Sequence, residues 1–142
     1  MSSNEEVEVI QLIRLSDIAK IMPLIDKFFE KVQTAYTQKQ FLQFLTATLF
    51  SPAVRVWVAF KGNEPIGYEV VVLSNTFYGN EMLLLQVYIK PKHKAKELLD
   101  EAEKWAKLMG CDLKTVMRRE KDKAMEKYGF KYELTIYKKE VK

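Results

Sequence analysis

Hydrophobic and polar positions alternate with two different periods along the chain, and the periods predict its elements. Val7 to Leu15 is rich in β-branched residues and alternates loosely, which predicts a strand. A helix is expected next, with Ser16 as its cap and Pro23 inside its apolar pattern. The proline must either kink this helix or mark its first regular turn after a short 3₁₀ entry.

A second helix and a β region are expected to follow. Thr37-Gln-Lys-Gln40 spells a capping box that opens a helix running through Leu49. Alternate positions from Val54 to Phe60 are apolar and share one face of a predicted strand. The returning strand, Ile66 to Leu73, carries Gly67, and a glycine inside a strand marks a close backbone approach or a bulge. Ser74 to Asn80 is expected to be a loop.

The longest pattern is a strand that leads into an amphipathic helix. An apolar run from Met82 ends at Pro91, and the residues after it repeat at three-and-four spacing up to Gly110. Gly110 is expected to end this helix in the left-handed conformation. The junction, Lys90 to Lys96, can hold an anion on the exposed amides of the helix start. The apolar face of the helix is Leu98, Leu99, Ala102, Trp105, Ala106 and Met109.

The last third adds a strand at Leu113–Met117, a helix at Glu120–Tyr128 that ends at Gly129, and a strand at Lys131–Val141. The order β-α-α-β-β-β-α-β-α-β predicts a mixed sheet flanked by helices. A length of 142 residues predicts one domain over residues 1–142, with residues 1–6 as a disordered tail.

Charge is unevenly distributed along the sequence. Residues 1–89 hold 7 Lys/Arg against 9 Asp/Glu, a net −2, whereas residues 90–142 hold 16 against 10, a net +6. A basic half predicts an anionic partner, which is a nucleotide, an acidic protein surface or a nucleic acid; the alternative is a solvated helix surface. Nucleic acid is the weakest option because the basic residues lack interleaved aromatics.

Cysteine content and hydropathy point to a cytoplasmic protein. The only cysteine is Cys111, which excludes an intrachain disulfide, fits a reducing compartment and is expected to be buried and inert. No apolar run approaches the roughly 18–20 residues of a membrane span, and the first residues do not resemble a signal peptide. No spacing of Cys and His suggests a metal site.

Three segments resemble motif A of the GCN5-related N-acetyltransferase (GNAT) superfamily. They are Val87-Tyr-Ile-Lys-Pro91, Leu98-Leu99 and Ala102-Glu-Lys-Trp-Ala-Lys-Leu-Met-Gly-Cys111, and the other elements match nearly the whole chain in order. The resemblance implies a GNAT-like α/β (α+β) single domain: a mixed, mostly antiparallel sheet of six to seven strands with about four helices. It also implies acetyl-CoA as donor and a primary amine, on a small molecule or a protein, as acceptor.

The resemblance implies that the donor lies along the end of the central strand and the start of the following helix. The family's Arg/Gln-x-x-Gly-x-Gly/Ala signature is absent, and Lys92-His-Lys-Ala-Lys-Glu97 is about four residues shorter and has no glycine. In one interpretation the lysines replace the amide donors and CoA still binds; in the other the cleft is vestigial. The expected cofactor-binding residues are Val87, Tyr88, Ile89, Lys92, Lys94, Ala95 and Lys96.

Candidate catalytic residues follow from the same resemblance. The family often places a tyrosine where this chain has Met125, and a thioether cannot donate a proton, so Tyr128, one turn later, is the candidate acid. Glu81 and Glu69 are candidates for a base acting through water, against the ordinary explanation of a solvent-facing strand end. Gln86 is expected to satisfy backbone or cofactor amides.

Loop residues complete the expected site. Tyr36, Phe77 and Tyr78 lie in loops that border the acceptor groove in this family, so they either line a pocket or close the core. His93 is expected to be exposed rather than catalytic. Two functions are therefore carried forward: an acetyl-CoA-dependent N-acetyltransferase with full or impaired activity, and a catalytically inactive GNAT-like module that binds a protein through its basic C-terminal half.

Overall fold

The computed structural model describes residues 6–32, 34, 36–77, 79–115 and 128–130. Within them, five strands form one sheet in the order β1-β2-β3-β4-β5. The pairs β1–β2, β2–β3 and β3–β4 are antiparallel, and β5 is parallel to β4. The strands are β1 (Val7–Leu12), β2 (Val54–Lys61), β3 (Glu64–Thr76), β4 (Gly79–Ile89) and β5 (Leu113–Thr115).

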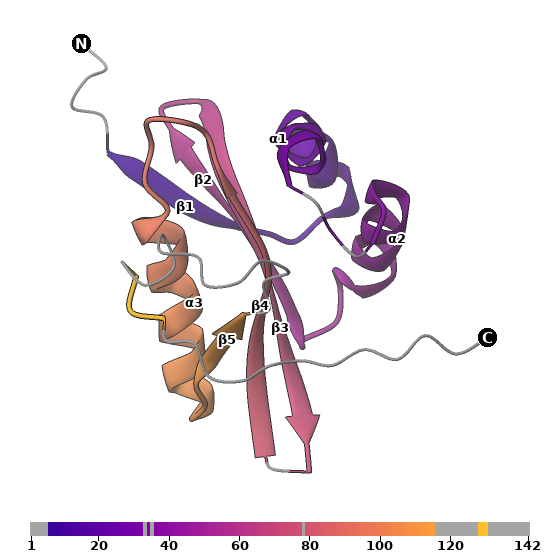
Figure 1. Ribbon diagram of the computed structural model, residues 1–142, viewed down its shortest axis with the longest axis vertical. Coiled ribbons are helices and arrows are strands. Elements are labelled where there is room, and N and C mark those ends of the chain that lie inside the picture. Colours follow the sequence, from indigo (N-terminus) through magenta and orange to yellow (C-terminus); the bar gives the residue numbers. More distant parts are fainter. Residues whose placement is uncertain (1–5, 33, 35, 78, 116–127, 131–142) are drawn as a thin grey trace.

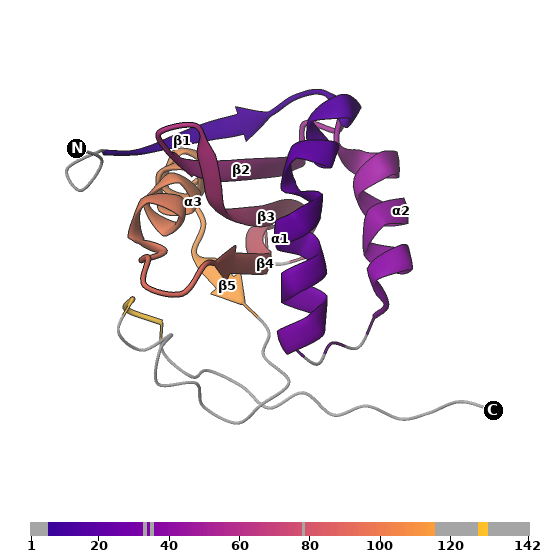
Figure 2. The ribbon, with the colours of Figure 1, turned by 90° about the horizontal axis from the view of Figure 1, so that it is seen from above.

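Helices cover both faces of this sheet. α1 (Ile18–Lys31) and α2 (Gln38–Thr48) pack on one face, and α3 (Lys96–Met109) packs on the other (Figures 1 and 2). The described residues thus form five strands and three α-helices, fewer than the six to seven strands and about four helices that the sequence predicts. The expected helix at 120–128, apart from Tyr128, and the expected strand at 131–141 lie outside the described residues. None of the described helices is both long and apolar enough to cross a lipid bilayer.

Two hydrophobic cores result, one on each face of the sheet. The alternating residues of β2 from Val54 to Phe60 pack under α1 and α2, as predicted. Trp57 lies on the opposite face, where its ring meets that of Trp105 of α3 edge to face, with centroids 5.9 Å apart. Arg55 stacks over the same Trp105 ring, at 4.4 Å from its centroid. The sheet is therefore buried on both faces in its centre.

Helix boundaries follow the local signals with one exception. The Thr37 and Gln40 capping box is formed, and Gly110 ends α3 with a φ of 71°. The prediction that Ser16 caps α1 is wrong: a 3₁₀ turn (Leu15–Asp17) precedes the helix, and no side chain caps either element. Pro23 lies inside α1, after this 3₁₀ entry.

The predicted loop from Ser74 to Asn80 is wrong as well. β3 continues to Thr76 and β4 resumes at Gly79, so the two strands form a long hairpin that projects beyond the rest of the sheet (Figure 1). The polar residues Ser74, Asn75 and Asn80 indicate a loop in the sequence, because strand residues are usually apolar side chains that pack on a half-buried surface. Here the strands pair with each other in solvent.

Candidate functional site

The outer edge of β4 is open near its end. The N–H of Lys90 donates to the carbonyl of Ile66, at 2.8 Å, so it points toward β3. Backbone groups alternate along a strand, which sends the N–H groups of Val87 and Ile89 to the opposite edge. Among the described residues, β5 pairs with that edge only at Met82–Leu84. The sequence named these two residues as donor-binding positions, and the structure gives them outward-facing amides.

A β-bulge interrupts β4 beside this open edge. Val71 pairs with Leu84 and Val70 pairs with Gln86, so Leu85 is the extra residue. The bulge places Leu85 and Gln86 on the α1/α2 face, whereas Leu84 and Val87 belong to the α3 core. The bulge therefore directs one polar side chain to the face opposite α3.

The start of α3 carries backbone donors without a side-chain cap. Ala95 is the N-cap residue, and the first intrahelical bond runs from the N–H of Leu99 to its carbonyl, at 3.0 Å. The N–H groups of Lys96, Glu97 and Leu98 therefore lack an intrahelical acceptor. The N–H of Ala95 donates to the hydroxyl of Tyr128, at 3.4 Å. This helix start offers free amides and a positive dipole end to an anion.

The loop before α3 is a tight turn without glycine. The N–H of His93 donates to the carbonyl of Lys90, at 3.2 Å, with Pro91 and Lys92 between them. Lys92 has a φ of 72°, the conformation that position i+2 of a type II turn requires and that glycine adopts without strain. Lys92 therefore adopts a backbone conformation that glycine favours.

The basic side chains around this loop do not all remain available. Lys96 is held along the helix by Asp100, at 2.8 Å, and this hydrogen bond raises the pKa of the Lys96 ammonium. Lys90 pairs with Glu64, at 2.7 Å. Lys92 and Lys94 are exposed and form no ion pair within the described residues. Of the predicted lysines, these two have ammonium groups free for an incoming anion.

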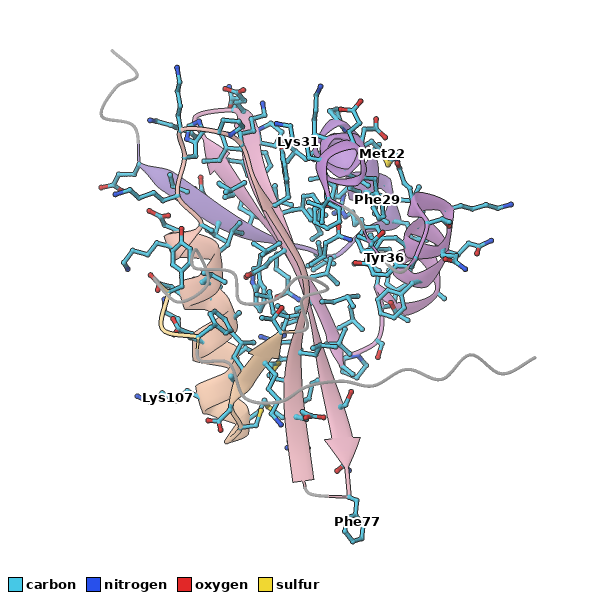
Figure 3. The ribbon with its side chains drawn as sticks, in the orientation of Figure 1. Met22, Phe29, Lys31, Tyr36, Phe77 and Lys107 are labelled. Carbon is cyan, nitrogen blue, oxygen red and sulfur yellow. The ribbon has the colours of Figure 1, made fainter. Side chains whose placement is uncertain are left out.

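The residues expected to line the acceptor pocket do not lie together. Tyr36 packs between α1, α2 and the sheet, with its ring centroid 5.9 Å from that of Phe29. Phe77 is 96% exposed at the tip of the β3–β4 hairpin, far from Tyr36 (Figure 3). Phe77 therefore does not close the core, and Tyr78 lies outside the described residues. Only Tyr36 lies near the bulge of β4.

The two carboxylates considered as bases differ sharply. Glu81 forms a partly exposed ion pair with Lys114, at 2.8 Å. Glu69 is fully buried on β3, so the solvent-facing interpretation is wrong for it. No described residue donates a hydrogen bond to either carboxyl oxygen of Glu69. Burial, and then the charge of Glu101, raise the pKa of Glu69 to about 9, so this side chain is a neutral acid near pH 7.

The sequence predictions for Gln86, His93 and Cys111 need correction. Within the described residues, Gln86 bonds the hydroxyls of Tyr36 and Tyr68 and not backbone amides. His93 and Cys111 are both half-buried, rather than exposed and buried respectively. Burial raises the pKa of the Cys111 thiol, and its expected inertness stays a prediction.

The burial of Glu69 is the feature that sequence reasoning missed. A signal was present, because Glu69 is flanked by Tyr68 and by the apolar run Val70–Leu73. Such near-continuous apolar runs are typical of strands that are covered on both faces, and a charged residue inside one becomes buried with its neighbours. The Gln86 network had a weaker signal, since the bulge that directs it cannot be read from residue types alone.

Comparisons with known proteins give the family. A sequence model of the acetyltransferase (GNAT) family matches residues 18–130. A search of curated protein sequences finds no match. Similar solved structures include the aminoglycoside N-acetyltransferase AAC(6')-Iy in complex with CoA, at a TM-score of 0.78 and 12% identity over 99% of this chain and 98% of that one.

Two further solved structures have similar folds, at comparable TM-scores and sequence identities. A predicted acetyltransferase with acetyl-CoA from Clostridium acetobutylicum has a TM-score of 0.74 and 15% identity over 95% of this chain and 96% of that one. The ribosomal-protein-alanine N-acetyltransferase of Brucella melitensis biovar Abortus 2308 has a TM-score of 0.71 and 16% identity, covering 96% and 100%. The fold and the family match agree, and this chain belongs to the GNAT family of acetyltransferases.

Proposed function

We propose that this protein transfers an acetyl group from acetyl-CoA to a primary amine. The observation that carries the proposal is the continuity between two sets of free backbone donors. The outward amides of Val87 and Ile89 lead along β4 to the uncapped start of α3. An extended chain with amide groups can pair with the first set, and a diphosphate can bind the second.

The donor-binding part of the proposal uses charge as well as backbone. Lys92 and Lys94 lie in the turn before α3 and have no ion pair among the described residues. Their ammonium groups complement a diphosphate that approaches the free amides of the helix start. The described residues therefore fit acetyl-CoA at its diphosphate end, even though the loop lacks the family's glycines.

The chemistry requires a neutral amine, a polarised thioester carbonyl and a proton for the leaving thiolate. Acetyl-CoA supplies the activated acyl group when bound. Backbone N–H groups on the open edge of β4 are the donors placed to polarise a carbonyl there. Glu69 cannot accept a proton near pH 7 because it is already protonated. Glu81 as base and Tyr128 as acid stay predictions.

Direct binding is the first test of this function. A ligand present at 100 times its dissociation constant adds about 2.7 kcal/mol to stability. We expect acetyl-CoA to raise the melting temperature of the wild type, and the double variant K92Q/K94Q to reduce the shift. Release of free CoA in the presence of amines then measures turnover. No thermal shift at millimolar acetyl-CoA would overturn the proposal and leave the binding module as the function to test.

The acceptor and the compartment are part of the same proposal. Solved structures of similar fold include an aminoglycoside acetyltransferase in complex with sisomicin and a ribosomal-protein-alanine acetyltransferase, so amines on sugars and on peptides are the first to assay. We also propose that residues 1–142 form one domain, because the described elements share one sheet. A free cysteine fits the cytoplasm.

A further inference from the structure

A chain of side-chain hydrogen bonds crosses the α1/α2 face of the sheet and ends at Tyr36. The hydroxyl of Tyr68 donates to Oε1 of Gln86, and Nε2 of Gln86 donates to the hydroxyl oxygen of Tyr36, at 3.0 Å. Tyr68 on β3 is fully buried, Gln86 on β4 is almost so, and Tyr36 is half-buried. The chain thus leads from the core of the sheet toward solvent.

The bulge in β4 is what makes this chain possible. If Leu84, Leu85 and Gln86 alternated as in a regular strand, Gln86 would lie on the same face as Leu84, under α3. With the bulge, the Gln86 amide lies against the two phenols on the other face. The bulge also lies next to Val87, whose amide faces the open edge proposed for the donor. The hydroxyl of Tyr36, 3.0 Å from Nε2 of Gln86, is therefore one side chain away from the residue that precedes Val87.

The direction of the hydrogen bonds is fixed from the buried end. Burial, reinforced by Tyr36 and Tyr88, raises the pKa of Tyr68 well above its usual range, so its hydroxyl stays protonated and can donate. Its hydrogen bond holds Oε1 of Gln86 inward, which leaves Nε2 facing Tyr36. The amide must then donate and the oxygen of Tyr36 must accept. The hydroxyl hydrogen of Tyr36 remains available for another partner.

Tyr36 is held in place by its ring. Its centroid lies 5.9 Å from that of Phe29 and 6.3 Å from that of Phe41, so α1 and α2 both fix its position (Figure 3). No residue that the structure describes accepts the hydroxyl hydrogen. A positioned donor of this kind favours an oxygen atom of a ligand and disfavours an ammonium group or an alkyl chain, which offer no lone pair.

We propose that Tyr36 is a specificity-determining residue that selects amines carrying a hydroxyl, ether or carbonyl oxygen near the reacting nitrogen. Gln86 and Tyr68 are positioning residues that act through Tyr36 by setting the direction of its hydrogen bond. This inference rests on the proposed function, because it names the class of acceptor for the same site. It predicts that the preference for oxygen-bearing amines depends on the hydroxyl of Tyr68, which contacts Gln86 and not the substrate.

A matched pair of amines tests the preference. 2-Methoxyethylamine and butylamine have nearly the same shape and differ by an ether oxygen in place of a methylene group. Release of CoA from acetyl-CoA is measured with each amine. We expect Y36F to lower kcat/KM for the ether amine about tenfold, the scale of one lost hydrogen bond, and to change the value for butylamine less than about twofold. Comparing each amine with itself removes differences in amine basicity.

Tyr68 provides the sharper variant. In Y68F the Gln86 amide loses the donor that orients it, so it can turn and accept from Tyr36. We expect Y68F to erase the ether preference although Tyr36 is intact, and Q86E, which can only accept when ionised, to do the same. The control T46V removes a hydroxyl of α2 that bonds the carbonyl of Leu42, at 2.8 Å, and should leave the preference unchanged. A preference that survives both Y68F and Q86E would overturn the positioning role.

A measurement without turnover separates this inference from the proposed function. With tyrosine labelled at the ζ carbon, the Tyr36 resonance is identified by its loss in Y36F. We expect it to shift on addition of 2-methoxyethylamine and to stay in place with butylamine, whether or not acetyl-CoA binds. Equal shifts with both amines, or none with either, would overturn the inference. A failed acetyl-CoA titration alone would overturn only the proposed transfer reaction.

Discussion

The backbone N–H of Ala95 donates to the hydroxyl of Tyr128 across 3.4 Å, so a side chain far along the sequence meets the first turn of α3. Ala95 offers no side chain to cap the helix, and the phenol accepts a hydrogen bond from its N–H. The next three N–H groups, those of Lys96, Glu97 and Leu98, are proposed to bind the diphosphate of acetyl-CoA. Tyr128 thus lies at the diphosphate end of the proposed site.

This contact predicts how Y128F divides its effects. A long hydrogen bond between neutral groups contributes about 0.5 kcal/mol, so the variant should lose less than about 1 kcal/mol of stability. The KM for acetyl-CoA should fall, because the amide of Ala95 becomes available to an anion, whereas kcat should stay within about twofold of the wild-type value. Steady-state kinetics measure both. A fall in kcat of about 10²-fold or more would instead support the predicted role of Tyr128 as general acid.

Glu69 predicts an unusual dependence of stability on pH. Its pKa is about 9 in the folded protein against an ordinary value of 4.5, because burial and then the charge of Glu101 disfavour the charged form. Between these two values the folded state holds a proton that the unfolded state has released. The unfolding free energy should therefore fall as pH rises, by at most about 1.4 kcal/mol per pH unit. The contribution is fully present below about pH 4.5 and is lost by about pH 9.

The variant E69L isolates this contribution. Leucine has a similar size and leaves no buried carboxyl without a donor, so we expect E69L to be more stable than the wild type, by a larger margin at pH 8 than at pH 5. Urea denaturation at several pH values gives the comparison. Arg55 lies on the same face but stacks on Trp105, so it does not neutralise Glu69 in this structure. Parallel pH curves for the two proteins would contradict the burial of a protonated Glu69.

The sequence predicted the elements whose signals are local. The Thr37 capping box, the alternating face of β2 and the left-handed Gly110 each depend on residues within a few positions, and all three are confirmed. The hairpin beyond Ser74 was missed because pairing between two polar strands replaces burial as the stabilising interaction.

The candidate site was less accessible to sequence reasoning because its key features depend on pairing. The family resemblance named Val87 as a cofactor-binding residue, but the bulge at Leu85, which decides the face of Gln86, appears only in the register with β3. The burial of Glu69 depends on α3, which packs on the face of the sheet that carries the paired residue Trp57. A single sequence names such residues without stating what surrounds them.

Gly67 predicts a steric requirement beside the open edge of β4. A Cβ at this position would lie 2.6 Å from the carbonyl oxygen of Tyr88 and 2.6 Å from Cδ1 of Ile89, which is the close approach expected from a strand glycine. G67A should therefore lower the unfolding free energy by about 1–3 kcal/mol. It should also weaken acetyl-CoA binding, because β4 must shift. Chemical denaturation and calorimetric titration measure the two effects.

The double variant G67A/I89V shows which contact matters. Valine lacks Cδ1, so the side-chain clash is removed while the clash with the Tyr88 carbonyl remains. We expect G67A to lower the unfolding free energy in the I89V background as well, but by less than in the wild type. Complete recovery would show that Ile89, and not the backbone of β4, sets the requirement for glycine.

Lys92 combines backbone strain with a proposed binding role, so two substitutions separate them. K92G relieves the positive φ of 72° and should raise the unfolding free energy by about 0.5–1 kcal/mol, after the entropy cost of glycine in the unfolded chain. K92Q keeps the strain and removes only the charge, so its stability should match the wild type. Both should weaken acetyl-CoA binding to a similar degree, because each loses the same ammonium group.

Chemical denaturation of the wild type, K92G and K92Q measures the stability effect, and calorimetric titration with acetyl-CoA measures the binding effect. Stability that falls in K92G would show that the Lys92 side chain makes contacts worth more than the strain, and unchanged binding in K92Q would remove this lysine from the diphosphate site.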